Sequence, residues 1–524
     1  MSDECRYCLL SEPLLRIRTA ADDRTGATLP EVLAGLAGDD IVSFQALQAH
    51  QRQAWYCFLV QLGAVALARD ESREPPGEAD RWRRLLLRLT DGEEAPWCLV
   101  VEDVSRPAFM QPPVPEGSLE EAGYKFSVPS PDELDMLVTA KNHDVKLRRM
   151  AAPRPEHWLY ALVTLQTLEG FSGRGNYGIV RMNGGYGSRP LVGMTPALGW
   201  GTRFRRDVPV LVAARQNLVA NHGYRPDGEA LLWLLPWDGG KSSGIPLRDC
   251  DPLFVEICRR IRLQRSEGRL RCRRAATSGA RVAASDDLNG VTGDPWTPID
   301  KAESKALSVG AGGFSYDRLH RILLSGDYVE PAALRKTDTE SEGGFLVATV
   351  LARGQGKTEG LHHRVVPIPA NAMRLFGSPS ERERLARRAE ERVETAAAVQ
   401  GSVLYPALRE LLTAGSDENV DGEKIQRWTG AFDADVDDAF FPDLWASLDL
   451  PHEEARRQWQ QQLHEFARRQ LQDAIDSAPL PSIRRYRAIS AAELTFRRCA
   501  HRELNELFPE TQEEEDDRER TTAG

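Results

Sequence analysis

The spacing of apolar residues changes near residue 378, and this change constrains the fold more than any other feature of the chain. Before it, short apolar runs alternate with glycines and prolines; after it, apolar residues recur at helical spacing over long stretches. Ser378-Pro379-Ser380, followed by acidic residues, is typical of a helix N-terminus and predicts a helix from Glu381 to about Leu412. Three more helices are predicted near residues 423–445, 452–475 and 491–507. Four helices joined by short turns indicate a helix bundle.

The preceding part of the chain has mixed character. Helical spacing predicts helices over Phe44–Arg69 and around Trp82–Leu89, whereas short β-branched runs predict strands at Leu231–Leu235, Leu346–Leu351 and Val365–Ile368. The expected fold class is therefore α+β. We expect a mixed α/β body over residues 1–370, an all-α four-helix bundle over 371–510, and an acidic, disordered tail over 511–524.

Composition limits the cellular setting. The 524 residues are 41% hydrophobic, but no apolar run approaches the roughly 20 residues of a membrane span. No signal peptide is recognisable, and the eight cysteines are scattered. Cys5-x-x-Cys8 has no second pair nearby, so free thiols are favoured over a zinc site. We expect a soluble cytoplasmic protein with no membrane contact.

The segment 353–360, Arg-Gly-Gln-Gly-Lys-Thr-Glu-Gly, contains the Gly-Lys-Thr of a nucleotide-binding P-loop. A P-loop needs another glycine five positions before Gly356, where this chain has Leu351, and a helix must follow. Here residues 361–369 contain two prolines and a β-branched pair, which predict a strand. The segment is therefore predicted to form the tip of a β-hairpin.

A second glycine-rich segment spans Gly170 to Gly178. Its Gly173-x-Gly175-x-x-Gly178 spacing matches a dinucleotide-binding turn, but the residues that follow do not predict the required helix. Glycines also allow another backbone to come close, in which case Arg174 and Asn176 would touch a phosphate or a groove edge. The alternative is a mobile surface loop.

Arginines are concentrated between residues 259 and 274, although the whole chain has a net charge of −11. This stretch holds eight arginines and one acid. Such segregation permits a basic surface on an acidic protein. A solvated helix face paired with carboxylates is an equally good interpretation.

Two histidine motifs offer the rival hypothesis of a metal-dependent phosphohydrolase or nuclease. His143-Asp144 are adjacent, as in HD-type phosphohydrolases, and His362-His363 form a pair. Neither has a second ligand pair at suitable spacing. We therefore predict no metal, no cofactor and no catalytic residue.

Taken together, these segments resemble the CasA family, the large subunit of the type I-E CRISPR surveillance complex Cascade. The resemblance extends over nearly the full length, and its motifs occur in the family's order. They are Leu9-Leu10-Ser11-Glu12-Pro13 with Leu29-Pro30-Glu31-Val32-Leu33, Phe109-Met110-Gln111, Gly170–Gly178, Thr292-Gly293-Asp294-Pro295-Trp296-Thr297-Pro298, Arg353–Gly360, and Phe432–Asp437 with Phe440–Trp445.

The resemblance implies a subunit that reads DNA and is not an enzyme. The family recognises the protospacer-adjacent motif (PAM) of duplex DNA from the minor groove and opens the next base pair. By this resemblance, the family's glycine loop, which approaches the duplex, corresponds to Gly170, Gly173, Arg174, Gly175 and Asn176. Its wedge hairpin, which separates the base pair, corresponds to Gln355, Gly356 and Lys357. The family's basic finger falls nearest Arg281, and its N-terminal loop falls on Lys141, Asn142, His143 and Lys146.

The arginine-rich stretch would then hold phosphates of the flanking duplex, through Arg259, Arg262, Arg265, Arg269, Arg271 and Arg273. The implied partners are double-stranded target DNA, the crRNA-bound Cascade subunits (Cas5-type, backbone and small subunits) and the Cas helicase-nuclease. A scaffold that only joins these subunits remains a second alternative.

Overall fold

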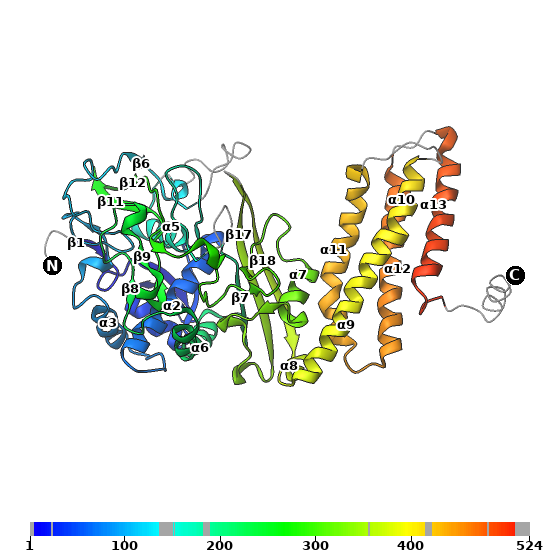
Figure 1. Cartoon of the computed structure of the whole chain (residues 1–524), viewed down its shortest axis with the longest axis horizontal. Helices are drawn as coiled ribbons and strands as arrows, with labels where there is room; N and C mark the ends of the chain where they lie inside the picture. Colours follow the sequence, from blue (N-terminus) through cyan, green and yellow to red (C-terminus); the bar gives the residue numbers. More distant parts are fainter. Residues whose placement is uncertain are drawn as a thin grey trace. The chain divides into compact units, whose positions relative to one another are not determined.

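The computed structural model describes residues 5–21, 25–135, 150, 152–181, 189–354, 357–413, 422–478 and 482–508. The chain divides into two compact units (Figure 1). The first comprises Met1–Phe314 and Asp327–Ala370, and the second comprises Ser315–Gly326 and Asn371–Gly524. The boundary near residue 370 matches the change in sequence pattern, but the assignment of Ser315–Gly326 to the second unit was not anticipated.

The second unit contains the predicted four-helix bundle, which confirms the α+β fold class. Its first helix is continuous through a π-helical segment, η11. The helices are α8 (Ala370–Leu375), α9 (Pro379–Ala398), η11 (Val399–Leu404), α10 (Tyr405–Thr413), α11 (Gly422–Ala446), α12 (His452–Ser477) and α13 (Ser482–Glu503). Helix α13 begins nine residues before the predicted start, because its first turns expose Ile483 and Tyr486 and so show no apolar stripe. None of the described helices has the length and apolarity needed to span a membrane.

The segment Ser315–Gly326 packs in the second unit as helix α7 (Tyr316–His320) and the π-helical turn η8 (Arg321–Ser325). The Tyr316 N–H donates to Asp437 Oδ1 at 2.5 Å, and the Tyr316 ring lies 5.0 Å from that of Phe440. The acidic motif around Asp437 therefore lies inside α11. The Asp437 carboxylate holds the segment Ser315–Gly326 against this helix.

The core of the first unit is built on α2 (Arg52–Arg69), whose residues from Gln53 to Leu67 are all buried. Further helices are α1 (Leu29–Ala37), α3 (Ala79–Arg88), α5 (Pro155–Leu168) and α6 (Trp200–His222). The predicted helix over 44–69 is eight residues too long at its start. Phe44 ends strand β4 (Ile41–Phe44) instead, because it pairs with Ile17 of β2.

A three-stranded antiparallel sheet carries the segment that resembled a P-loop. Strand β17 (Gly343–Gly354) lies between β7 (Leu191–Thr195) and β18 (Lys357–Pro369). The register runs from Gly343↔Pro369 to Gly354↔Lys357, with a bulge between Ala352 and Arg353. This pairing confirms the predicted β-hairpin and excludes the P-loop, since a strand and not a helix follows the glycines.

The arginine-rich stretch forms a second hairpin. Strands β11 (Arg260–Ser266) and β12 (Arg269–Ala275) pair directly, and β6 (Phe126–Val128) adds to β12.

The other strands are β1 (Cys5–Cys8), β2 (Leu15–Thr19), β3 (Thr25–Ala27), β5 (Cys98–Val101), β8 (Glu229–Leu231), β9 (Ile245–Pro246), β10 (Cys250–Val255), β13 (Val282–Ala283), β14 (Ile299–Asp300), β15 (Lys305–Ala306) and β16 (Tyr328–Val329). Only Leu231 of the predicted strand Leu231–Leu235 is in a strand, because the following carbonyls accept hydrogen bonds from Arg281.

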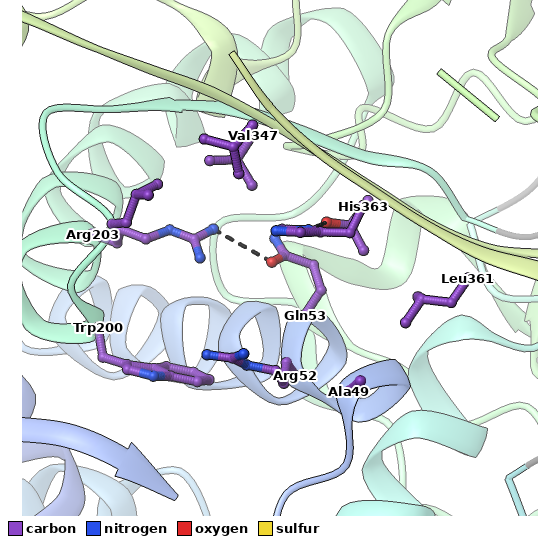
Figure 2. A pocket seen from close by; sticks show the side chains of 11 residues that line it. Ala49, Arg52, Gln53, Trp200, Arg203, Val347, Leu361 and His363 are labelled. Carbon is purple, nitrogen blue, oxygen red and sulfur yellow. Dashed lines mark hydrogen bonds between the residues drawn. The ribbon is translucent and has the colours of Figure 1, made fainter. Parts of the chain in front are cut away.

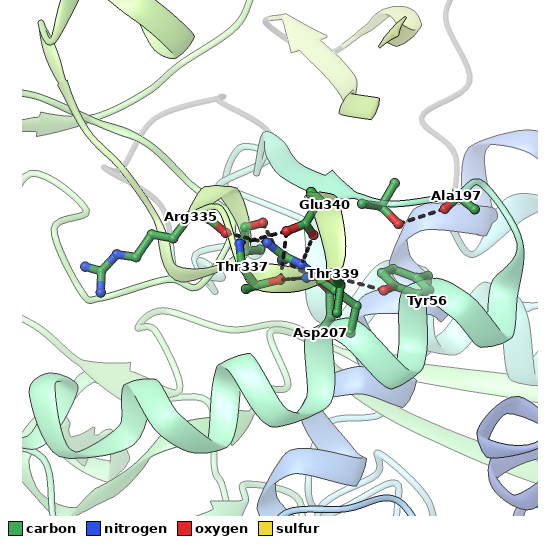
Figure 3. A network of polar contacts seen from close by, with 10 residues as sticks. Tyr56, Ala197, Asp207, Arg335, Thr337, Thr339 and Glu340 are labelled. Atoms are coloured by element: carbon green, nitrogen blue, oxygen red, sulfur yellow. Dashed lines mark hydrogen bonds and ion pairs between the residues drawn. The ribbon is translucent and has the colours of Figure 1, made fainter. Parts of the chain in front are cut away.

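A buried polar network fixes the base of the β17–β18 hairpin (Figure 3). Arg206 of α6 donates to Glu340 Oε1 at 2.8 Å, to Asp207 Oδ1 at 2.8 Å and to the Ala333 carbonyl at 2.7 Å. Glu340 in turn accepts from the Thr337 N–H, and Tyr56 of α2 donates to Asp207. Arg206 and Glu340 are both almost fully buried, so the segment entering β17 is tied to two core helices.

Candidate nucleic-acid interface

The glycine loop after α5 is a closed turn. The Asn176 N–H donates to the Gly173 carbonyl at 3.0 Å, and the Ser172 N–H donates back to the Asn176 carbonyl at 3.1 Å. Gly173 and Gly175 have φ of +81° and +84°, in the left-handed region that side chains disfavour. The loop is therefore an ordered structure that requires glycine at both positions.

Arg259 and Thr277 hold this loop in place through hydrogen bonds to its carbonyls. The buried guanidinium of Arg259 donates to the carbonyls of Gly170 at 2.5 Å and of Gly178 at 2.7 Å, which closes the two ends of the loop. The Thr277 N–H donates to the Gly175 carbonyl at 2.8 Å. The Arg174 side chain remains exposed, so the turn presents one cation and a thin backbone to solvent.

Arg353 joins the end of the β17–β18 hairpin to the glycine loop. Its side chain is 5% exposed and forms an ion pair with Glu169, the residue immediately before Gly170. It also donates to Thr358 Oγ1 at 2.7 Å, across the hairpin, and to the Asp135 carbonyl at 3.0 Å. One buried arginine therefore contacts the hairpin, the start of the glycine loop and the last described residue before the predicted N-terminal loop.

Both described flanks of that N-terminal loop are anchored. The Asp135 carboxylate accepts from Gln51 Nε2 at 2.7 Å and lies 2.8 Å from His50 Nε2. At the other flank, the Met150 N–H donates to Asp132 Oδ2 at 3.0 Å. Asp135 and Met150, the nearest described residues on either side, are thus both held by hydrogen bonds.

Several predicted site residues lie outside the described residues. They are Lys141, Asn142, His143 and Lys146 of the N-terminal loop, and Gln355 and Gly356 of the hairpin. Lys357 is described as the first residue of β18, paired with Gly354. What the structure brings together is three described residues next to these segments, Arg353, Glu169 and Asp135. Sequence analysis did not anticipate the contacts of these three residues, although Arg353 begins one predicted motif and Glu169 directly precedes another.

The predicted phosphate contacts of the arginine-rich stretch need correction. Arg259 and Arg262 are buried, and Arg262 donates to the carbonyls of Val101, Asp103 and Arg106. Burial lowers the pKa of Arg262 to about 10. Because strand side chains alternate between faces, only some arginines of a hairpin can point outward. Against the prediction, the guanidinium groups of Arg259 and Arg262 therefore face backbone carbonyls and not solvent.

The other predicted contacts in this stretch remain available to solvent. Arg265, Arg269 and Arg271 are exposed and Arg273 is half-exposed. Arg271 pairs with Glu267 at 3.4 Å and Arg273 with Glu120 at 3.2 Å, and all four of these side chains are at least two-fifths exposed. Such surface pairs are weak and can exchange for phosphate.

Arg281, the predicted basic finger, is likewise buried in the structure. Its side chain is 1% exposed and donates to the carbonyls of Leu232, Leu235 and Pro236. Burial lowers its pKa to about 10. Its guanidinium is bound to carbonyls of the turn after β8 and does not face solvent, as a basic finger would.

The histidine pair of the rival enzyme hypothesis does not converge on one ligand. His362 and His363 are consecutive residues of β18 and therefore point to opposite faces of the sheet. His363 Nδ1 lies 2.8 Å from Thr349 Oγ1, whereas His362 lies against Gly313. His143-Asp144 lies outside the described residues. Within the described ranges, no three His, Cys, Asp or Glu side chains gather in the manner of a metal site.

The fold matches solved structures of Cse1 proteins over nearly the whole chain. Cse1 from Acidimicrobium ferrooxidans is 17% identical with a TM-score of 0.61, and the match covers 97% of this chain and 100% of that one. Thermobifida fusca Cse1 is 17% identical with a TM-score of 0.63, covering 96% and 98%. Thermus thermophilus CasA (Cse1) is 14% identical with a TM-score of 0.57, covering 95% and 99%. At these identities the likeness establishes the fold of a Cse1 protein.

Membership in the family follows from the sequence itself. The model of the CRISPR-associated protein Cse1 family matches residues 9–470. This chain therefore belongs to the CRISPR-associated protein Cse1 family. The comparison with curated proteins finds no match.

Proposed function

We propose that this chain is the non-catalytic large subunit of a type I-E Cascade complex, which recognises the PAM from the minor groove and opens the adjacent duplex. The observation that carries the proposal is the buried Arg353 node. It joins the end of the β17–β18 hairpin, the start of the glycine loop at Glu169 and the flank of the N-terminal loop at Asp135. The hairpin, the glycine loop and the N-terminal loop are each proposed to contact DNA. The Arg353 side chain contacts described residues of, or next to, all three segments.

The glycine loop has the shape and charge expected of a groove-reading element. Gly173 and Gly175 carry no side chain to hold the duplex away, and Arg174 is exposed between them. A cation on thin backbone can approach a narrow minor groove, whose base code is degenerate. Recognition there tolerates more than one PAM sequence, while phosphate contacts supply most of the affinity.

Buried contacts at both ends of the hairpin support the proposal that it opens the duplex. Unstacking a base step of the DNA costs on the order of a few kcal/mol. The protein element that enters the duplex must therefore keep its conformation against an opposing free energy of that size. Strands β17 and β18 are 12 and 13 residues long, and one end is fixed by the Arg206 network while Arg353 fixes the other. Gln355 and Lys357 are proposed as the wedge residues, and pairing with the guide RNA then offsets the opening cost.

The proposed partners follow from the family and from one structural match. A chain of a CRISPR RNA-guided surveillance complex is 14% identical with a TM-score of 0.58, and the match covers 94% of this chain and 99% of that one. We propose that this chain likewise joins crRNA-bound subunits (Cas5-type, backbone and small), binds double-stranded target DNA in the cytoplasm and recruits the Cas helicase-nuclease.

PAM-scanning binding assays on the reconstituted complex test this function. We expect Arg174→Ala to lower duplex affinity and to reduce the slope of log affinity against log salt by roughly 0.9 for each phosphate that the variant no longer neutralises. Arg248→Ala removes an exposed arginine elsewhere in the same unit and serves as the matched control. Equal affinity for every PAM sequence would favour the scaffold hypothesis, and DNA cleavage by the purified chain with manganese would favour the enzyme.

A further inference from the structure

A pocket on the hairpin's sheet is not used by the proposed function. It lies within the first unit, has a volume of about 270 Å³, and is lined from three directions (Figure 2). Arg52 and Gln53 come from α2, Trp200 and Arg203 from α6, and His363 from β18. Its remaining lining is Ala49, Leu198, Val347, Thr349, Leu361 and Val365.

The charge of this pocket is unbalanced. Its lining includes two arginines but no Asp or Glu among the described residues. Arg203 donates to the neutral Gln53 Oε1 at 3.4 Å, and its guanidinium lies 4.0 Å from the Tyr56 ring centroid. Among the buried arginines of the unit, Arg189 pairs with Asp294, whereas Arg262 and Arg281 donate to backbone carbonyls. In the pocket, Arg52 is exposed and Arg203 is half-buried. The pocket is therefore suited to an anion.

His363 adds a polar group that does not cancel this charge. Burial lowers its pKa, and the nearby Arg203 and Arg52 lower it further. The ring is thus neutral at pH 7 and can exchange a hydrogen bond with a ligand. In Figure 2, Arg203 and His363 flank the same space, with Gln53 between them.

The apolar part of the lining includes an aromatic ring, and the Arg52 guanidinium lies 5.9 Å from the centroid of that ring, which belongs to Trp200. Val347 and Leu361 belong to the same apolar part, and Leu361 is 38% exposed. A ligand with both a flat apolar part and an anionic part would satisfy both kinds of lining residue. The volume of about 270 Å³ lies just below the roughly 300–1,000 Å³ typical of small-molecule pockets, which suits one nucleotide and no larger ligand.

The position of the pocket also favours a nucleotide. Thr349 and His363 form a directly paired position of the hairpin, four residues along β17 from Arg353. At about 3.3 Å per residue, the pocket is roughly 13 Å from the residue that supports the proposed wedge. A strand released at the hairpin end would reach it within a few nucleotides.

We infer that this pocket binds a single nucleotide unit, with the phosphate between Arg52 and Arg203 and the base against apolar lining residues such as Trp200. The nucleotide is either free or part of a single strand. Only the source of such a strand, a duplex opened by the hairpin, rests on the proposed function. Aromatic and arginine side chains are a common combination for holding single-stranded nucleic acid.

Binding of fluorescein-labelled pentathymidylate to the full-length chain tests the site without any duplex, so its outcome is separate from PAM reading. The double variant Arg52→Gln/Arg203→Gln should bind at least about tenfold more weakly, because two charged hydrogen-bond donors are removed. Arg205→Gln is the matched control, since Arg205 lies on the same helix but pairs with Asp39 at 2.8 Å, outside the pocket. Its affinity should stay within twofold of the wild type.

Competition identifies the source of the nucleotide. Displacement of the label by thymidine 5′-monophosphate supports a free nucleotide, whereas displacement only by unlabelled oligonucleotide supports a strand. Equal displacement by inorganic phosphate would overturn the inference, because a bare anion site needs no base. So would unchanged binding by the double variant.

Photo-crosslinking keeps the inference testable if the double variant does not fold. A 4-thiothymidine oligonucleotide should crosslink the wild-type chain in peptides from α6 or β18. Crosslinks confined to other segments would overturn the proposed site.

Discussion

Substitution of Arg353 tests whether one buried ion pair supports the candidate interface. Arg353→Met leaves the Glu169 carboxylate, which is 6% exposed, without its partner. Removing one member of a buried pair costs about 3–5 kcal/mol of stability. At 1.4 kcal/mol for each factor of ten, local opening of the glycine loop should become at least about 100-fold more frequent.

A double-mutant cycle separates this ion pair from general disruption. Glu169→Met/Arg353→Met removes both charges, and only the Asp135 carbonyl and the Thr358 hydroxyl then lose a donor. An unsatisfied buried polar group costs about 1–3 kcal/mol, so the double variant should be more stable than Arg353→Met alone. Arg106→Met breaks an exposed pair with Glu93 and should cost less than about 1 kcal/mol.

Hydrogen exchange read by mass spectrometry is the assay, with urea unfolding for global stability. Faster exchange is expected in peptides covering 169–177 and 351–360, and little change in the helices of the second unit. Additive costs in the cycle, or exchange that increases equally everywhere, would refute the idea that Arg353 couples the hairpin to the glycine loop.

Four other predictions follow from single residues. Gly175→Ala should cost about 1–2 kcal/mol in loop stability, seen by hydrogen exchange, because its φ is +84°. Arg281→Met should lower the unfolding free energy but leave the salt dependence of DNA binding unchanged, since it serves buried carbonyls; a changed salt slope would restore it as a DNA contact. Burial raises the pKa of Glu256 to about 8, so the folded state holds a proton that the unfolded chain releases near pH 4.5. Stability should therefore fall as pH rises from 4.5 to 8, and Glu256→Gln should flatten that dependence in thermal melts. His363 should titrate below pH 6.5 by NMR, and the Arg52→Gln/Arg203→Gln variant should raise its pKa; an unmoved midpoint would show that the arginines do not face the ring.

The elements that sequence analysis predicted correctly are those with long, uninterrupted patterns. Helices α11 and α12 begin and end within two residues of their predicted bounds, because burial repeats along their whole length. The hairpin of β17 and β18 was predictable because β-branched runs flank the glycines. Helix α2 was extended too far, because Phe44 matched the helical spacing although it belongs to a strand.

The role of each arginine was the least predictable feature. Sequence gives the charge of Arg259, Arg262 and Arg281, but not whether the guanidinium faces solvent or backbone carbonyls. That outcome depends on residues distant in sequence, such as Val101, whose carbonyl accepts a hydrogen bond from Arg262. The Arg353–Glu169 pair spans 184 residues and has no local signature.

The most direct test of DNA opening is fluorescence of 2-aminopurine placed at the first base pair beside the PAM. The complete guide-RNA complex with the wild-type chain should raise this fluorescence on duplex DNA. Gln355→Ala/Lys357→Ala should slow that rise strongly, yet should bind a pre-opened duplex as well as the wild type does. An equal loss on duplex and pre-opened DNA would contradict a wedge role for the hairpin.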